Sequence, residues 1–132
     1  MATEGGAVNH TFEYAIIRVL PRIERGEQIN VGVILYCQRH SYLAARTHLD
    51  SDRLLALDPS IDLDAVRVAL RSLEATSGGG AAGGPAAAMR PGDRFRWLTA
   101  PRSTIIQAGP VHTGFTADPD AELTRLLDLL VR

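Results

Sequence analysis

The chain has 132 residues, of which 45% are hydrophobic, and a formal net charge of −1 at pH 7. This length fits one domain that buries enough surface to fold without crosslinks, and the single cysteine excludes an internal disulfide. All fourteen positive charges are arginines, which excludes Schiff-base and phosphate-loop chemistry that depends on lysine.

The charges are distributed unevenly along the chain. Residues 77–113 carry four arginines and one acid, whereas residues 50–76 carry three arginines and six acids. This separation is too small to predict a nucleic-acid-binding surface, which usually needs a strongly basic domain. The N-terminus has no basic segment followed by an apolar one, and no apolar run reaches the length of a membrane span. We therefore expect a cytoplasmic protein.

Three strands are predicted in the first part of the chain. Residues 1–12 are mostly small and polar and are expected to be disordered. Apolar residues then alternate with others over residues 14–20, 31–37 and 42–49, which predicts an antiparallel meander. Gly32 indicates a bulge or a close approach of two backbones. Strict alternation in the second strand predicts one shared face for Val31, Val33, Leu35 and Cys37.

Helices are predicted in the second part. Ser51 can cap a short helix over residues 52–57, and Asp62 can cap a longer one that ends near Thr76. Residues 77–92 are rich in glycine and alanine and predict a flexible linker. Asp118, followed by proline and acids, predicts the start of a C-terminal helix.

Between the linker and this last helix, residues 94–98 and 103–108 alternate apolar and polar side chains and predict two more strands. The predicted fold is therefore α+β. An antiparallel sheet of about five strands begins with a three-stranded meander, and about three helices pack mainly on one face. Residues 13–132 form a single domain.

The connection over residues 21–30 is longer than a hairpin requires and is a candidate recognition loop. We expect Glu27 and Asn30 to shape the loop, while Arg22 and Arg25 face outward.

Other candidates lie along the strands. Arg18 interrupts an apolar stripe, either as a residue of the sheet margin or as an anion contact. Arg102 and Ser103 could bind an anion, and His112 could carry a proton or be a satisfied turn residue. Trp97 is expected in the core. The full set of candidate recognition or anion-binding residues is Arg18, Arg22, Arg25, Glu27, Asn30, Arg46, Arg102, Ser103 and His112.

The sequence predicts no metal site and no cofactor. The four histidines and Cys37 lack the spacing of zinc ligands. Neither a nucleophile elbow nor a dinucleotide fingerprint occurs, and no complete set of catalytic residues can be assigned.

The segment over residues 22–37, with its Glu27-x-x-Asn30-x-Gly32 core, resembles the bacterial DUF3037 family. Residues 95–103 and the leucine-rich C-terminal helix extend the resemblance to residues 14–131. The use of arginine without lysine makes the sequence look like an actinobacterial member. The family implies no catalytic residues. Its members are often encoded beside a HipA-like kinase, which implies such a kinase as a partner.

Three hypotheses follow from the sequence. The first is a non-catalytic accessory or regulatory protein that acts with a protein partner. The second is a small enzyme that acts on a phosphorylated or nucleotide-like substrate through an arginine-rich face. In that case we expect Arg18, Glu27, Arg102 and His112 to converge in one concave site. The third is a nucleic-acid-binding module.

Overall fold

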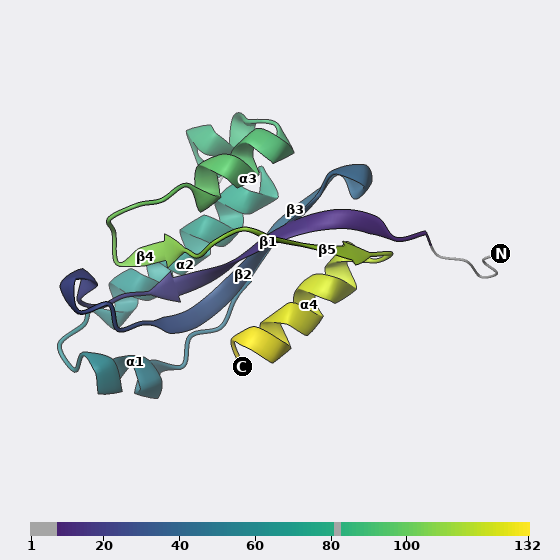
Figure 1. The fold of residues 1–132 in the computed structure, drawn as a ribbon. Coiled ribbons are helices and arrows are strands. Elements are labelled where there is room, and N and C mark those ends of the chain that lie inside the picture. The colour runs from purple at the N-terminus through teal and green to yellow at the C-terminus, as the bar shows by residue number, and fades with distance from the viewer. Residues whose placement is uncertain (1–7, 81–82) are drawn as a thin grey trace.

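The computed structural model describes residues 8–80 and 83–132 and contains one five-stranded antiparallel sheet with helices on both faces (Figure 1). The predicted α+β fold, beginning with a meander, is confirmed. The strands are β1 (His10–Val19), β2 (Ile29–Cys37), β3 (Tyr42–Thr47), β4 (Ile106–Ala108) and β5 (His112–Thr116). The helices are α1 (Ser51–Leu57), α2 (Leu63–Gly78), α3 (Pro91–Thr99) and α4 (Pro119–Leu130).

One edge of the sheet is an interrupted strand. The strand order is β3–β2–β1–β4, and β5 also pairs with β1. β5 pairs with the first half of β1 and β4 with its second half. The segment from β4 to β5 therefore runs antiparallel beside β1. The break falls at residues 109–111, where Pro110 has no N–H to donate to the ladder.

β1 begins earlier than predicted. Its residues 10–12 were expected in the disordered N-terminal segment, but they pair with β5, and the Phe12 side chain is buried. Burial of this aromatic ring explains why the sheet extends so far toward the N-terminus. The same expectation for residues 1–7 lies outside the described residues.

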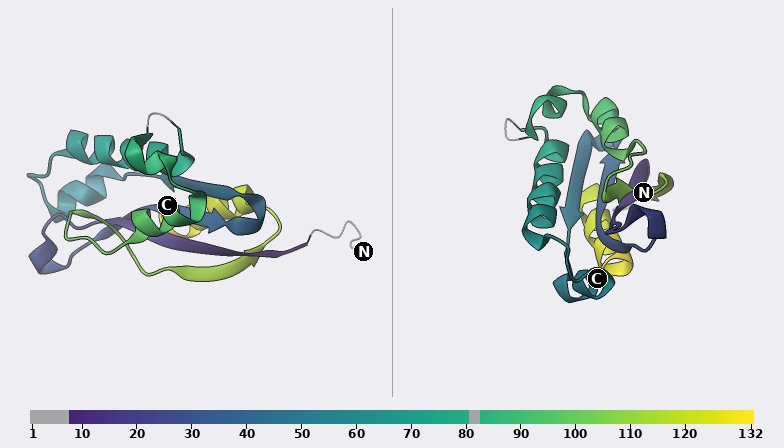
Figure 2. Two further views of the ribbon diagram at one scale, coloured as in Figure 1. Left: turned by 90° about the horizontal axis from the view of Figure 1, so that it is seen from above. Right: turned by 90° about the vertical axis from the view of Figure 1, so that its left-hand side faces the viewer.

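Two cores lie on opposite faces of the sheet, with α2 and α4 on opposite sides (Figure 2). The first three helices cover one face, and the last helix covers the other. The α2-side core consists of Ala15, Ile17, Val19, Ile29, Val31, Ile34, Leu43, Ala45, Leu54, Val66, Leu70, Phe95 and Leu98. The α4-side core consists of Phe12, Val33, Leu35, Cys37, Leu123, Leu126, Leu127 and Val131.

A bulge in β2 distributes its side chains between these cores. Ile17 pairs with Gly32 but Arg18 pairs with Asn30, so Val31 is an extra residue in the ladder. The predicted shared face is therefore wrong for Val31, which belongs to the α2-side core, whereas Val33, Leu35 and Cys37 do share the α4-side core. The bulge and the close approach predicted at Gly32 are both present.

The prediction of a strand over residues 94–98 is wrong, because this segment belongs to α3. Pro91 occupies the first turn and Asp93 follows it, an arrangement that favours a helix start. The buried Phe95 and Leu98 are three residues apart on the helix and face the α2-side core together.

The segment over residues 77–92 contains more regular structure than a linker. Ser77 and Gly78 complete α2, Pro85–Ala88 form the 3-10 helix η4, and Pro91 opens α3. Arg94 is buried, with 8% of the residue exposed. Its guanidinium donates to the carbonyl oxygens of Ala87 and Met89 at 3.1 and 2.6 Å. These bonds tie η4 to α3. Flexibility of the remaining residues stays a prediction, and residues 81–82 lie outside the described residues.

The helix starts follow the expected capping chemistry, with one correction. Asp62 and Asp118 cap α2 and α4 through bonds to backbone N–H groups, as predicted. α1 begins one residue earlier than expected, so Ser51 is its first helical residue. The cap is Asp50, which accepts from the Arg53 N–H at 3.2 Å.

Candidate functional site

The loop over residues 21–30 contains its own ion pairs. Arg25 Nε lies 2.7 Å from Glu27 Oε1, and both side chains are exposed. Hydrogen bonding to this guanidinium lowers the pKa of the Glu27 carboxyl. Arg22 Nη2 lies 4.0 Å from Asp58 Oδ1. Arg22 and Arg25 face outward as expected, but their charges are compensated within the protein.

Asn30 connects the sheet to α4. Its Nδ2 donates to the Leu130 carbonyl oxygen at 3.1 Å, so it bonds to the last turn of α4 instead of closing the mouth of the loop. This contact satisfies one of the carbonyls left free at a helix C-terminus.

Arg46 connects β3 to the start of α4. Its guanidinium forms an ion pair with Asp120 and donates to Thr124 Oγ1 at 2.6 Å. Tyr42 Oη donates to the same Asp120 carboxylate at 2.9 Å. The hydrogen bonds that Asp120 accepts from Tyr42 and Arg46 hold the pKa of its carboxyl below the ordinary value. Burial and the neighbouring Asp120 carboxylate raise the pKa of Tyr42 to about 12. Arg46 is therefore engaged in the fold.

Ser103 and His112 lie in different elements. His112 is the first residue of β5, not a turn residue, and its exposed ring lies 5.4 Å from the Tyr14 ring between centroids. Ser103 lies in the exposed loop before β4. Among the described residues, no hydrogen bond joins the two, and Glu27 belongs to the loop described above.

Arg18 and Arg102 do converge. They line one open cavity of about 420 Å³ beside the break between β4 and β5. The lining contains two arginines and no acidic residue. The full lining is Arg18, Thr99, Pro101, Arg102, Gln107, Ala108, Gly109, Pro110 and Val111.

Arg18 is positioned mainly by packing. Its guanidinium lies so close to Gly109 that a Cβ there would be 2.5 Å from Nη2. Nη1 donates to Gln28 Oε1 over a long 3.4 Å, and the buried Nε has no partner among the described residues. The positive charge of Arg18 thus meets no carboxylate in the part of the chain that the structure describes.

Arg102 closes the C-terminal end of α3. It donates to the carbonyl oxygens of Trp97 and Leu98 at 2.6 and 3.1 Å, which a cation near a helix C-terminus does favourably. Its guanidinium carbon also lies 4.7 Å from the centroid of the Trp97 ring. The side chain is fixed in place, although no ion pair neutralises its charge among the described residues.

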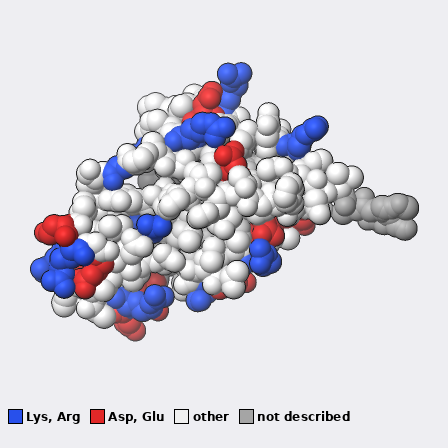
Figure 3. Space-filling view, viewed as in Figure 1, with Lys and Arg blue, Asp and Glu red and all other residues white. Residues whose placement is uncertain are grey.

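Trp97 is exposed, contrary to the prediction that it belongs to the core. The residue is 49% exposed, and Val111, which lines the cavity, is 43% exposed. On β5, Phe115 is 74% exposed. The face of the molecule over β4 and β5 is mostly free of charged side chains (Figure 3). Apolar side chains that are exposed together mark contact sites for other molecules, and here Arg102 contacts Trp97 and lines a cavity with Val111.

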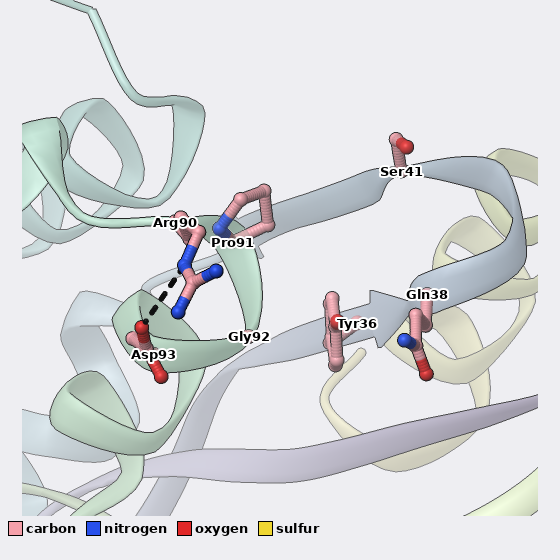
Figure 4. Close-up of a pocket in the computed structure, with 7 residues that line it drawn as sticks. All are labelled: Tyr36, Gln38, Ser41, Arg90, Pro91, Gly92 and Asp93. Carbon is pink, nitrogen blue, oxygen red and sulfur yellow. Dashed lines mark ion pairs between the residues drawn. The ribbon is translucent and has the colours of Figure 1, made fainter.

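A second concave region lies at the start of α3 (Figure 4). Its cavity of about 300 Å³ separates Arg90 and the first turn of α3 from Tyr36, Gln38 and Ser41. Arg90 Nε lies 3.6 Å from Asp93 Oδ2. An adjoining cavity shares Tyr36 and Gln38 and contains Glu13 and Arg96, whose charged atoms are 3.7 Å apart. Unlike Arg18 and Arg102, both arginines here have acidic partners.

Metal-ligating residues do not gather within residues 8–80 and 83–132, where no group of three or more His, Cys, Asp or Glu could hold an ion. Cys37 is buried, and its Sγ lies 3.6 Å from the Thr11 carbonyl oxygen. The helices described are all too short or too polar to cross a membrane.

Sequence reasoning missed the exposed Trp97 and the cleft at the start of α3. The signal for Trp97 was present: a helix that begins at Pro91 places residue 97 about 200° around the axis from the buried Phe95. No sequence signal identified the cleft, since Tyr36 and Gln38 lie far from Arg90 in the chain.

The fold and these cavities define a small α+β domain with an open arginine-lined surface at one sheet edge. The model of the family described as "Protein of unknown function (DUF3037)" matches residues 14–131. The chain therefore belongs to the DUF3037 family, as the sequence resemblance indicated. No curated protein and no solved structure matches the chain.

Proposed function

We propose that this chain is a non-catalytic accessory or regulatory protein that binds a protein partner, and that the partner is a HipA-like kinase. The observation that carries the proposal is the exposed Trp97 with Arg102 stacked on it, together with the exposed Val111, which lines one cavity with Arg102. The choice of kinase is supported only by the frequent proximity of such kinases to genes of this family.

The chemistry of this surface suits protein binding. Tryptophan and arginine are the residues most enriched among those that dominate binding energy at protein interfaces. A tryptophan left half exposed on a folded protein loses hydrophobic stabilisation that a partner can supply by covering it. Arg102 is held by two carbonyls and an aromatic ring, so little side-chain entropy is lost when it contacts a partner.

The alternative of an enzyme for a phosphorylated substrate is favoured by one observation, the cavity shared by Arg18 and Arg102. However, Glu27 forms its ion pair with Arg25, and His112 lies beside Tyr14 on β5. The arginine cavity therefore has neither of the proton-transfer groups that the enzyme hypothesis expected. For a nucleic-acid module, the mixed charges and the net charge of −1 offer little support.

The test is direct binding between the purified chain and a HipA-like kinase from the same genome, measured by calorimetry. We expect Trp97→Ala to weaken binding about tenfold or more, because truncation of an interface tryptophan often costs over 1 kcal/mol. Leu129→Ala is the matched control, since Leu129 is also an exposed apolar residue but lies on α4. Absence of binding by the wild-type chain would contradict the kinase assignment. Equal effects of Trp97→Ala and Leu129→Ala on the affinity would contradict the assignment of the binding surface to the region around Trp97.

A further inference from the structure

We propose that the cavity between Arg18 and Arg102 binds a side-chain carboxylate from an acidic segment of the protein partner. This inference rests on the proposed function, because it takes the ligand to be part of a protein. It adds the chemistry that the partner must present: an acidic residue next to apolar ones.

Charge is the first argument. Eight arginines form ion pairs within the described residues, but Arg18 and Arg102 form none. Both line the same cavity, which has no acidic residue in its lining. Two uncompensated guanidinium groups around one hollow create a positive potential there. A carboxylate is the simplest group that neutralises it, because a guanidinium matches its geometry with paired N–H donors.

Unused hydrogen-bonding capacity is the second argument. A guanidinium has five N–H donors, but that of Arg18 makes a single side-chain hydrogen bond among the described residues, the long one to Gln28. Its partly buried guanidinium lies against Gly109, where a Cβ would be 2.5 Å from Nη2, so the glycine lets this guanidinium rest close to the backbone. Positioning of a charge by packing, without a counter-charge, costs solvation energy that an anionic ligand can restore.

The apolar part of the surface distinguishes a peptide from a free anion. Pro101, Pro110 and Val111 line the same cavity, and the exposed Trp97 lies under the Arg102 guanidinium. A carboxylate on a peptide can bring a neighbouring apolar side chain to these residues. Inorganic phosphate has no group for them.

A nucleic acid fits the surface less well than an acidic peptide. A phosphate backbone is bound through many basic contacts along a groove. Outside this cavity the face over β4 and β5 is mostly uncharged (Figure 3), and the arginines of the second cleft are paired with acids. The observations therefore favour a short acidic segment.

The experiment uses Trp97, the only tryptophan, as a fluorescent reporter beside the cavity. The full chain is titrated with a blocked peptide that has two adjacent glutamates flanked by leucines. Parallel titrations use the same peptide with glutamines, inorganic phosphate and a single-stranded oligonucleotide. We expect only the glutamate peptide to change Trp97 emission with saturation.

The variant Arg18→Gln should weaken peptide binding about tenfold or more, as expected for loss of a hydrogen bond to a charged group. Arg71→Gln is the matched control, because Arg71 is likewise without an ion pair among the described residues but lies exposed on α2, away from the cavity. Arg18→Lys keeps the charge and should retain part of the affinity. If Arg18→Gln does not fold, as judged by circular dichroism, the inference is tested by two other measurements. Arg18→Lys should bind the glutamate peptide more weakly than wild type, and the glutamine peptide should not bind.

Several outcomes overturn the inference: equal binding of the glutamine peptide, no effect of Arg18→Gln in a folded variant, or saturable binding of phosphate or oligonucleotide in place of the peptide. The two proposals fail separately. If the kinase binds in a Trp97-dependent manner but the glutamate peptide neither binds nor competes, only this inference falls. If the peptide binds through Arg18 but the kinase does not bind, only the proposed partner falls.

Discussion

Gly32 lies on β2 where the backbone of β3 is too close to leave room for a side chain. A Cβ at this position would lie 2.7 Å from the Arg46 carbonyl oxygen and 3.0 Å from Thr47 Cγ2. The first of these atoms belongs to the backbone of the neighbouring strand, so it cannot move without disturbing the ladder. This contact explains why a glycine stands next to the β2 bulge.

We therefore predict that Gly32→Ala lowers the free energy of unfolding by about 1–3 kcal/mol, the usual cost of overpacking. The measurement is urea denaturation. Gly78→Ala is the control, because it lies at the end of α2 with no atom within 4 Å of its built Cβ, and alanine is the better helix former. Equal destabilisation by the two changes would show that close approach does not limit position 32.

The carboxylate of Asp120 makes stability depend on pH in the acid range. Its pKa is lowered by the hydrogen bond from Tyr42 and then by Arg46. A depressed pKa in the folded state stabilises the protein above the ordinary carboxyl value of about 4, and this stabilisation is lost as pH falls through the folded-state pKa. Tyr42 has the opposite sign: its raised pKa stabilises the fold below about 10, and this contribution is lost as pH rises toward 12.

We predict that Asp120→Asn lowers the melting temperature at neutral pH, and that the difference from wild type shrinks as pH falls below about 4. Thermal melts over a pH series measure it. The matched control is Asp64→Asn, at the equivalent position of α2, where the one side-chain partner among the described residues is Arg67. A difference from wild type that is constant with pH would contradict the role of the ionised carboxylate.

At the scale of elements, α2 protects an edge of the sheet. β3 is the outer strand on one side, and its outward N–H groups would otherwise be open to pairing with another chain. The Ala45 N–H donates to Ser77 Oγ at 3.0 Å, and the Thr47 N–H donates to Glu74 Oε2 at 2.9 Å. Two side chains of α2 thus take the place of a further strand.

This contact predicts a stability role for a residue that the sequence assigned to a linker. Ser77→Ala leaves the Ala45 N–H without a partner in a buried position, so the free energy of unfolding should fall by about 1–3 kcal/mol. Chemical denaturation measures the change. Ser72→Ala, on the exposed side of the same helix, should stay within about 0.5 kcal/mol of wild type. A silent Ser77→Ala would mean that water replaces the hydroxyl.

The elements with strong local signals could be predicted from the sequence. Asp62 and Asp118 define the starts of α2 and α4 because capping is a local interaction. The segment over residues 94–98 was ambiguous, since five residues fit both alternation and helical spacing. Pro91 resolves this ambiguity only if it is taken as a helix start and not as a part of a linker.

The candidate site was less predictable than the fold. Arg18 and Arg102 were both candidate anion contacts, with Arg18 left open as a residue of the sheet margin, but their convergence depends on how β1 and the segment after α3 come together. Arg46 was a candidate recognition residue on a predicted strand, and Asn30 was expected to shape the recognition loop. Their actual partners, Asp120 and Leu130, belong to the last helix, and no local pattern relates residues so distant in the chain.

At the scale of the whole molecule, one sheet separates two cores. β1 and β2 contribute to both of them: Ile17 and Val31 face α2, whereas Phe12 and Val33 face α4. Neither core can be lost without exposing one face of these strands. The protein should therefore unfold in a single transition, as small domains with a shared core usually do.

Leu123→Ala tests this coupling. Leu123 is fully buried in the α4-side core, and its truncation should lower the free energy of unfolding by about 2–5 kcal/mol. Trp97 lies on α3, on the other side of the sheet, so its fluorescence reports a distant event. If the cores are coupled, the urea midpoint moves by the same amount in Trp97 fluorescence and in far-ultraviolet circular dichroism. Leu129→Ala, at a position 65% exposed on the same helix, controls for a general effect on α4. A circular dichroism transition that moves while the Trp97 transition does not would show that α4 and its core unfold independently of the α2 side.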